Sequence, residues 1–201
     1  MHPRIFAAFD RVCRERGAGG DVLEIGATSA PDTLLRLPAL ARARSRAGVD
    51  LEGGTTCDGI PILRANTNDL SLFAAASFDT VLANSVLEHD PRFWLTLAEV
   101  RRVSRPGALV VLGVPAYAPG TSAPLLRRLA RVPVAGALVR RAAGARLAST
   151  PTLVVHDFPG DYYRFSAQAM REVLLDGLDE REVTTLMSPP RVVGSGRAPV
   201  R

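Results

Sequence analysis

Phe78-Asp-Thr-Val-Leu-Ala-Asn84 is apolar at nearly every position, as expected for a strand buried on both faces of a parallel sheet. Residues 91–103 follow as a predicted helix with three apolar side chains on one face, Phe93, Leu97 and Val100. Leu109-Val-Val-Leu-Gly-Val114 is then a second buried strand. A strand, a helix and a further strand in this order predict a βαβ unit of a parallel sheet.

The rest of the chain continues this alternation. Turn residues and apolar periodicity predict helices at 3–16, from Pro31 to about Arg46 with an interruption at Pro38, and at 166–175. They predict strands at 21–26, 48–51, 60–64, 182–187 and 191–194. The last two strands are expected to close the sheet as an antiparallel pair. The predicted fold class is therefore α/β, with a seven-stranded, mostly parallel sheet and helices on both faces.

The composition favours a single cytoplasmic domain of 201 residues. All the basic residues are arginines, and they are spread along the chain, so the net charge of +5 does not indicate nucleic-acid binding. Cys13 and Cys57 are expected to be free thiols. The longest apolar run, Ala108–Ala118, is too short to span a membrane, and the first residues do not form a signal-peptide pattern.

Residues 118–155 interrupt the alternation with arginines among apolar stretches. The sequence predicts a helical lid inserted after the fifth strand. It would cover an acceptor pocket, exclude water and attract an anionic substrate. A solvated helical face and a homodimer contact are equally open alternatives for this segment.

Five signals occur in a fixed order along the chain. They are Leu23-Glu-Ile-Gly26, Val49-Asp50, Asn66-Thr-Asn-Asp-Leu70, Ser77-Phe-Asp-Thr-Val-Leu-Ala-Asn-Ser-Val-Leu-Glu-His89 and Glu99-Val-Arg-Arg-Val-Ser-Arg-Pro-Gly107. In this set the chain resembles the class I S-adenosylmethionine-dependent methyltransferases, closely over residues 20–115 and more loosely over 155–197. The resemblance implies a Rossmann-like fold.

The resemblance also implies a binding site for S-adenosylmethionine at the carboxyl ends of the strands. Its candidate residues are Glu24, Gly26, Ala27, Asp50, Leu51, Asn66, Thr67, Asp69, Asn84 and Ser85. Gly26 lets the backbone approach the cofactor, and the Asp50 carboxylate can accept hydrogen bonds from the ribose hydroxyls. Either Asn66 or Asp69 would bind the adenine edge and Leu51 would cover its face. Asn84 and Ser85 would border the methionine end.

The first loop departs from the family pattern E-x-G-x-G-x-G. It is Glu24-Ile-Gly-Ala-Thr-Ser-Ala30, with Thr28 and Ala30 in place of two glycines. A residue with a side chain resists a positive φ, so the loop is expected to follow a different path. This departure keeps open a non-catalytic protein of the same fold, which serves binding or assembly.

His89 and His156 are the candidate general bases, because their ordinary pKa suits the removal of a proton from a hydroxyl or amine. A packing role for His89 remains an alternative. The second histidine lies in a stretch similar to H-x-x-P-x-D-Y-x-R-[FY]-[ST], where Asp161 and Arg164 can instead form an ion pair that fixes the loop. No metal is expected, because no cluster of ligands at metal spacing is present.

Three other residues are given structural roles. Asp79 is expected to support the fold, Asp90 to cap the helix that begins with Pro91, and Trp94 to lie in the core or the pocket wall.

The expected activity is methyl transfer to an oxygen or nitrogen of a small-molecule acceptor, with natural products and sugars among the candidate classes. A nicotinamide-dependent oxidoreductase is disfavoured, since G-x-G-x-x-G is absent.

Overall fold

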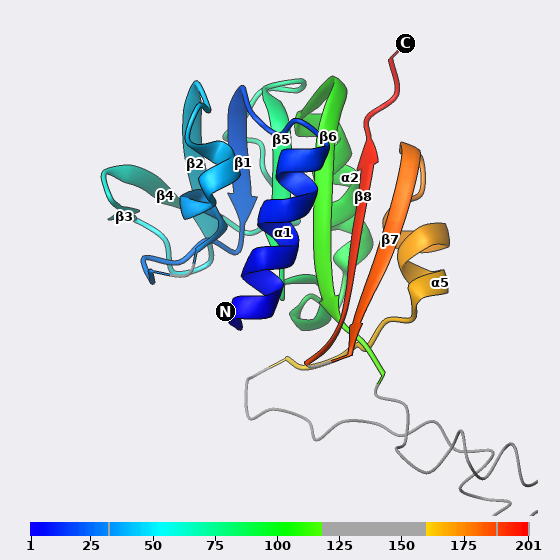
Figure 1. Ribbon diagram of the computed structural model, residues 1–201. Coiled ribbons are helices and arrows are strands. Elements are labelled where there is room, and N and C mark those ends of the chain that lie inside the picture. The colour runs from blue at the N-terminus through cyan, green and yellow to red at the C-terminus, as the bar shows by residue number, and fades with distance from the viewer. Residues whose placement is uncertain (32, 118–159, 188, 201) are drawn as a thin grey trace, which may run out of the picture. The chain divides into compact units, whose positions relative to one another are not determined.

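The sheet is built from the apolar runs of the sequence. The computed structural model describes residues 1–31, 33–117, 160–187 and 189–200 (Figure 1). All features described below belong to the unit formed by Met1–Ala116 and Phe158–Arg201. The predicted lid at 118–155 and His156 lie outside the described residues.

The strands of the described residues are β1 (Asp21–Ile25), β2 (Ser45–Asp50), β3 (Thr55–Cys57), β4 (Ile60–Arg64), β5 (Phe78–Asn84), β6 (Ser104–Pro115), β7 (Asp179–Met187) and β8 (Pro190–Arg197). The helices are α1 (Pro3–Glu15), α2 (Phe93–Val103) and α5 (Ala167–Ala169), with shorter helical turns η1 (Leu34–Arg36), η2 (Pro38–Leu40), η3 (Leu87–His89) and η4 (Met170–Leu174).

These strands form one sheet in the order β3-β4-β2-β1-β5-β6-β8-β7. The five strands from β4 to β6 are parallel, while β3, β8 and β7 pair antiparallel with their neighbours. The α/β class and the closing antiparallel pair are confirmed. The sheet has eight strands instead of seven, because β3 adds a short hairpin strand at one edge.

Each face of the sheet has its own apolar layer. On one face α1 packs on the central strands, with Phe9 fully buried beside Leu82 and Val111 (Figure 1). On the other face α2 and η4 cover Val81, Val110 and their neighbours. Because side chains alternate along each buried strand, neighbouring residues of one strand supply the two layers.

The predicted helix from Pro31 to about Arg46 is wrong. The segment contains only η1 and η2, and β2 already begins at Ser45. Leu37 has an extended backbone (φ −56°, ψ 129°), because the ring of Pro38 excludes the helical conformation from the residue before it. The α1 face of the sheet therefore carries two short turns, one on each side of Leu37, where an interrupted helix was expected.

One of the structural assignments made from sequence holds. Asp79 accepts hydrogen bonds from the Asp21 amide (2.8 Å), Arg44 (2.8 Å) and Arg105 (2.6 Å), which ties the starts of β1, β5 and β6 together. Ser166 caps the last helix by accepting from the Ala169 amide at 3.0 Å. The helix continues as the π-helical turn η4.

Two others are wrong. Asp90 is not the cap of α2: the helix begins at Phe93, and Arg92 is the residue before it. Trp94 is 53% exposed, so it is not a core residue. The Trp94 ring makes an edge contact with Phe93 (5.6 Å between ring centroids) on the outer side of α2.

Phe9 provides a direct test of the α1 layer. Replacing Phe9, which is 0% exposed, with alanine is expected to lower the free energy of unfolding by about 3–5 kcal/mol, because a large buried ring is lost and a cavity remains. Chemical denaturation measures this change. The control is Arg11→Ala on the exposed side of α1, which should change stability by less than about 0.5 kcal/mol. Equal effects of the two substitutions would contradict the packing described.

Candidate functional site

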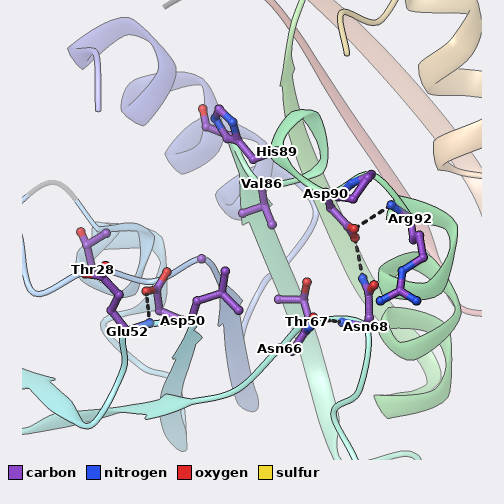
Figure 2. Close-up of a pocket in the computed structure, with 14 residues that line it drawn as sticks. Thr28, Asp50, Glu52, Asn66, Thr67, Asn68, Val86, His89, Asp90 and Arg92 are labelled. Atoms are coloured by element: carbon purple, nitrogen blue, oxygen red, sulfur yellow. Dashed lines mark hydrogen bonds between the residues drawn. The ribbon is translucent and has the colours of Figure 1, made fainter. Parts of the chain in front are cut away.

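A pocket with a volume of about 650 Å³ lies at the carboxyl ends of β1, β2, β4 and β5. Ligands of open α/β sheets bind at this edge. Seven of the residues predicted from sequence line the pocket: Gly26, Asp50, Leu51, Asn66, Thr67, Ser85 and His89. The pocket also has lining residues that were not predicted to bind: Thr28, Glu52, Asn68, Val86, Asp90, Pro91 and Arg92 (Figure 2).

Four predicted residues do not line this pocket: Glu24, Ala27, Asp69 and Asn84. Ala27 is 1% exposed, and Asp69 forms an exposed turn in which its carboxylate accepts from the Ser71 amide at 3.0 Å. Asn84 ends β5 and donates to the Ser85 hydroxyl at 3.1 Å, whereas its own oxygen is buried without a partner.

Glu24 is the buried anchor of the segment after β1. Its carboxyl group accepts hydrogen bonds from the Thr33 hydroxyl, from the Leu34 amide (3.0 Å) and from the Leu35 amide (3.1 Å). Burial disfavours the charged form and outweighs these three bonds, so the pKa of Glu24 is raised from 4.5 to about 7. The amide groups at the start of η1 therefore donate to this carboxyl group and are not free for a ligand.

Gly26 is required by both its conformation and its surroundings. Its φ is +74°, and a Cβ there would lie 2.3 Å from Cγ2 of Val86, a residue of the pocket wall. The Gly26 and Ala27 amides both donate to the Val49 carbonyl (2.9 and 3.1 Å), which closes the turn onto β2. In this structure, the lack of a side chain at Gly26 makes room for the side chain of Val86.

The altered glycine loop brings a side chain to the pocket at Thr28. Among residues 26–31, only Gly26 has a positive φ. Thr28, in place of a family glycine, brings a hydroxyl and a methyl group to the pocket, and its oxygen accepts from the Ala30 amide at 3.4 Å.

Ser85 carries backbone strain at the pocket. Its φ of +58° is unusual for a residue with a side chain, and its amide donates to the Gly113 carbonyl at 3.0 Å. Such strain persists only where surrounding contacts hold it, and it is common at functional sites. The chain thereby turns away from β5 and opens the space above the strand end.

Asp50 ends β2 with a carboxylate at the pocket (Figure 2). Oδ1 accepts from the Glu52 amide at 2.9 Å, while Oδ2 has no hydrogen bond to a described residue. The lining as a whole carries three carboxylates, Asp50, Glu52 and Asp90, and one guanidinium, Arg92. This excess of negative charge favours a cationic ligand.

His89 lies between the pocket and the loop after residue 159. Its Nδ1 is 3.3 Å from the Gly160 carbonyl oxygen, and its Nε2 is 4.0 Å from Oε1 of Glu88. Glu88 is fully buried, and burial raises the pKa of its carboxyl despite Arg191 at 3.4 Å. The amides of Tyr162 and Tyr163 donate to the Glu88 carbonyl, so this turn holds the loop.

The predicted ion pair between Asp161 and Arg164 is confirmed, with Nη2 of the arginine 2.6 Å from Oδ2 of the aspartate. Within the described ranges, no group of three or more metal-binding side chains gathers. None of the described helices combines the length and the apolar character that crossing a membrane requires. Both described cysteines, Cys13 and Cys57, are buried free thiols.

Comparison with known proteins identifies a matching family model and structures of similar fold. Residues 35–112 match the family model described as a methyltransferase domain. A search of curated proteins gives no match. The N-methyltransferase NodS of Bradyrhizobium japonicum WM9, crystallised with S-adenosylhomocysteine, superposes with a TM-score of 0.61 at 15% identity over 98% of this chain and 86% of that chain.

Two further solved structures agree in fold. One is the 1,6-didemethyltoxoflavin-N1-methyltransferase of Burkholderia thailandensis (TM-score 0.60, 15% identity, 96% of this chain and 78% of that chain). The other is a SAM-dependent methyltransferase of Archaeoglobus fulgidus (TM-score 0.63, 11% identity, 96% and 93%). The resemblance drawn from the sequence is confirmed: the chain has the fold of the class I S-adenosylmethionine-dependent methyltransferases. The family match over residues 35–112 is to a methyltransferase domain, and the solved neighbours show the shared fold.

The raised pKa of Glu24 predicts a pH-dependent stability. Between pH 4.5 and about 7 the folded chain keeps a proton that the unfolded chain releases, so this stabilising contribution is complete below pH 4.5 and is lost as pH rises through about 7. The wild type should lose about 3 kcal/mol relative to Glu24→Gln over this interval. Urea denaturation of both proteins from pH 4.5 to 8 measures the difference, and a constant difference would contradict the burial-driven shift.

Proposed function

We propose that this chain transfers the methyl group of S-adenosylmethionine to an oxygen or nitrogen of a small-molecule acceptor. The observation that carries the proposal is the pocket at the carboxyl ends of the strands, where carboxylates outnumber guanidinium groups and one Asp50 oxygen is available. An acidic lining suits the positively charged sulfonium of this cofactor. It also suits the ribose diol, whose two hydroxyls need a carboxylate acceptor.

The same pocket disfavours a nicotinamide dinucleotide. Such cofactors place a pyrophosphate on the free amide groups at the start of the helix after the first strand. Here that helix is replaced by short turns, and the amides of Leu34 and Leu35 are already bonded to Glu24. A pyrophosphate would meet carboxylates where it needs donors.

In the proposed reaction the acceptor lone pair attacks the methyl carbon as the carbon–sulfur bond breaks. The bonding electrons remain on sulfur, and neutral S-adenosylhomocysteine leaves. Alignment of the acceptor with the methyl group supplies most of the rate, since effective molarities for such alignment reach about 10⁵ M or more. A base takes the acceptor proton, and His89 is the described histidine at the pocket.

A non-catalytic protein of the same fold is the second candidate, because Thr28 and Ala30 replace loop glycines. Binding and turnover distinguish the two: both functions allow the cofactor to bind, but only an enzyme transfers a labelled methyl group to an acceptor.

Asp50 tests the cofactor site. Asp50→Ala should weaken binding of S-adenosylhomocysteine about 10–100-fold, which corresponds to about 1–3 kcal/mol, because the ribose hydroxyls lose a charged partner. Isothermal titration calorimetry measures the affinity. Glu15→Ala, which removes an exposed carboxylate at the end of α1, is the matched control and should bind as the wild type does. Unchanged affinity for Asp50→Ala would remove this carboxylate from the site.

His89 tests the chemistry. With an acceptor found by screening metabolites against labelled cofactor, His89→Gln is expected to lower kcat at least tenfold, because proton removal by a positioned base contributes about 10²–10⁴-fold. The affinity for S-adenosylhomocysteine should stay within about twofold. Full kcat together with a lower melting temperature would assign His89 to holding the loop at Gly160 instead.

A further inference from the structure

Asp90 is the centre of a hydrogen-bond network at the pocket. Its Oδ1 accepts from the Arg92 amide at 2.8 Å, and its Oδ2 accepts from Nδ2 of Asn68 (2.6 Å) and from the hydroxyl of Thr96 (2.8 Å) (Figure 2). The carboxylate therefore joins the turn after β4 to the first turns of α2. All these bonds use neutral donors.

The direction of each hydrogen bond in the network follows from the one before it. The Thr96 hydroxyl donates its hydrogen bond to Asp90. Its oxygen therefore accepts from Nδ2 of Asn68 at 2.9 Å and from the Thr67 hydroxyl at 2.7 Å. Thr96 is 0% exposed and Thr67 8% exposed, so water does not compete for these bonds. With these buried hydroxyls at its centre, the network holds one arrangement of its donors and acceptors.

This arrangement fixes the orientation of the Asn68 amide. A carboxylate only accepts hydrogen bonds, so the atom of Asn68 that faces Asp90 must be the NH₂ group. The Asn68 oxygen is then the polar atom left over, and among the described residues none donates to it. Because Asn68 lines the pocket, this oxygen is available to a ligand that carries an N–H group.

Asn66 supplies the complementary group. Its Oδ1 accepts from the Asn68 amide at 3.0 Å, which leaves its NH₂ group as a donor with no bond to a described residue. The turn therefore offers a donor and an acceptor from two neighbouring side chains of the pocket. An adenine edge carries an amino donor next to a ring-nitrogen acceptor, which is the matching pattern.

The turn also lies on the correct side of the ribose site. The Ala65 amide donates to the Asp50 carbonyl at 2.9 Å, so residues 66–68 directly adjoin the carboxylate proposed to bind the ribose. The base is attached to the ribose and must extend to one side of it. On this side the pocket offers amide groups suited to a planar base edge.

We infer that Asp90 is a positioning residue: by holding Asn68, it makes the pocket select the 6-amino group of the cofactor base. This inference rests on the proposed function. A 6-oxo base would set its carbonyl against the Asn68 oxygen and a ring N–H against the Asn66 NH₂ group. Two unfavourable pairings would replace two hydrogen bonds.

The test compares S-adenosylhomocysteine with S-inosylhomocysteine, its 6-oxo analogue, by isothermal titration calorimetry. The wild type should bind the 6-amino compound at least tenfold more tightly. In Asp90→Asn, the Arg92 amide requires the new amide oxygen, so the new NH₂ group faces Asn68. Asn68 must then turn over and present its own NH₂ group to the pocket, and the ratio of affinities should fall at least tenfold.

Two further variants complete the test. Asn68→Leu removes the selecting oxygen and should also lower the ratio of affinities, to the part that Asn66 provides. This variant decides the matter if Asp90→Asn does not fold in thermal denaturation. Asp176→Asn, at an exposed carboxylate 4.0 Å from Arg181, is the matched control and should keep the wild-type ratio. An unchanged ratio in a folded Asp90→Asn or Asn68→Leu would overturn the inference. Wild type that binds both compounds equally would overturn it while leaving the proposed function intact, whereas wild type that binds neither would refute the proposed function itself.

Discussion

The arrangement of the pocket depends on one buried carboxyl group. Glu24 lies in the middle of β1, and its hydrogen bonds to the Thr33 hydroxyl and the Leu34 and Leu35 amides draw the following segment onto the strand. These bonds replace the helix start that other α/β folds leave open for a phosphate group. The carboxyl thus shapes the loop after Gly26 and removes an anion site from the pocket edge. What remains is an acidic opening that suits a sulfonium cofactor.

Two further sets of contacts shape the pocket. The strained Ser85 and the close contact of Val86 with Gly26 turn the chain away from β5. The Asp90 network fixes the turn after β4. The short turn η3 links Val86 to Asp90, so this turn and the sheet set the spacing between the two sets of contacts. Such preorganisation is what methyl transfer requires, because alignment provides most of its rate.

Much of this could be predicted from the sequence, and the failures have physical causes. Long apolar runs such as Phe78–Asn84 specify buried strands whatever surrounds them. The position of Asp50 in the pocket could be predicted because this residue ends a strand of the parallel sheet. The helix predicted from Pro31 failed because Pro38 outweighs the apolar periodicity around it. β3 was missed although Asp58-Gly59, with φ of +50° and +77°, is a strong hairpin signal. Asn68 and Asp90 were not assigned to the site, because their roles arise from contacts between segments 22 residues apart. The proline after Asp90 suggested a simple helix cap instead.

The most direct test of the account is a crystal structure of the chain with S-adenosylhomocysteine. The account predicts the ligand in the pocket at the carboxyl ends of β1, β2, β4 and β5, with its ribose hydroxyls within hydrogen-bond distance of the Asp50 carboxylate and its base against Asn66 and Asn68. A ligand bound elsewhere on the chain, or with its base directed toward Ser85, would contradict the account.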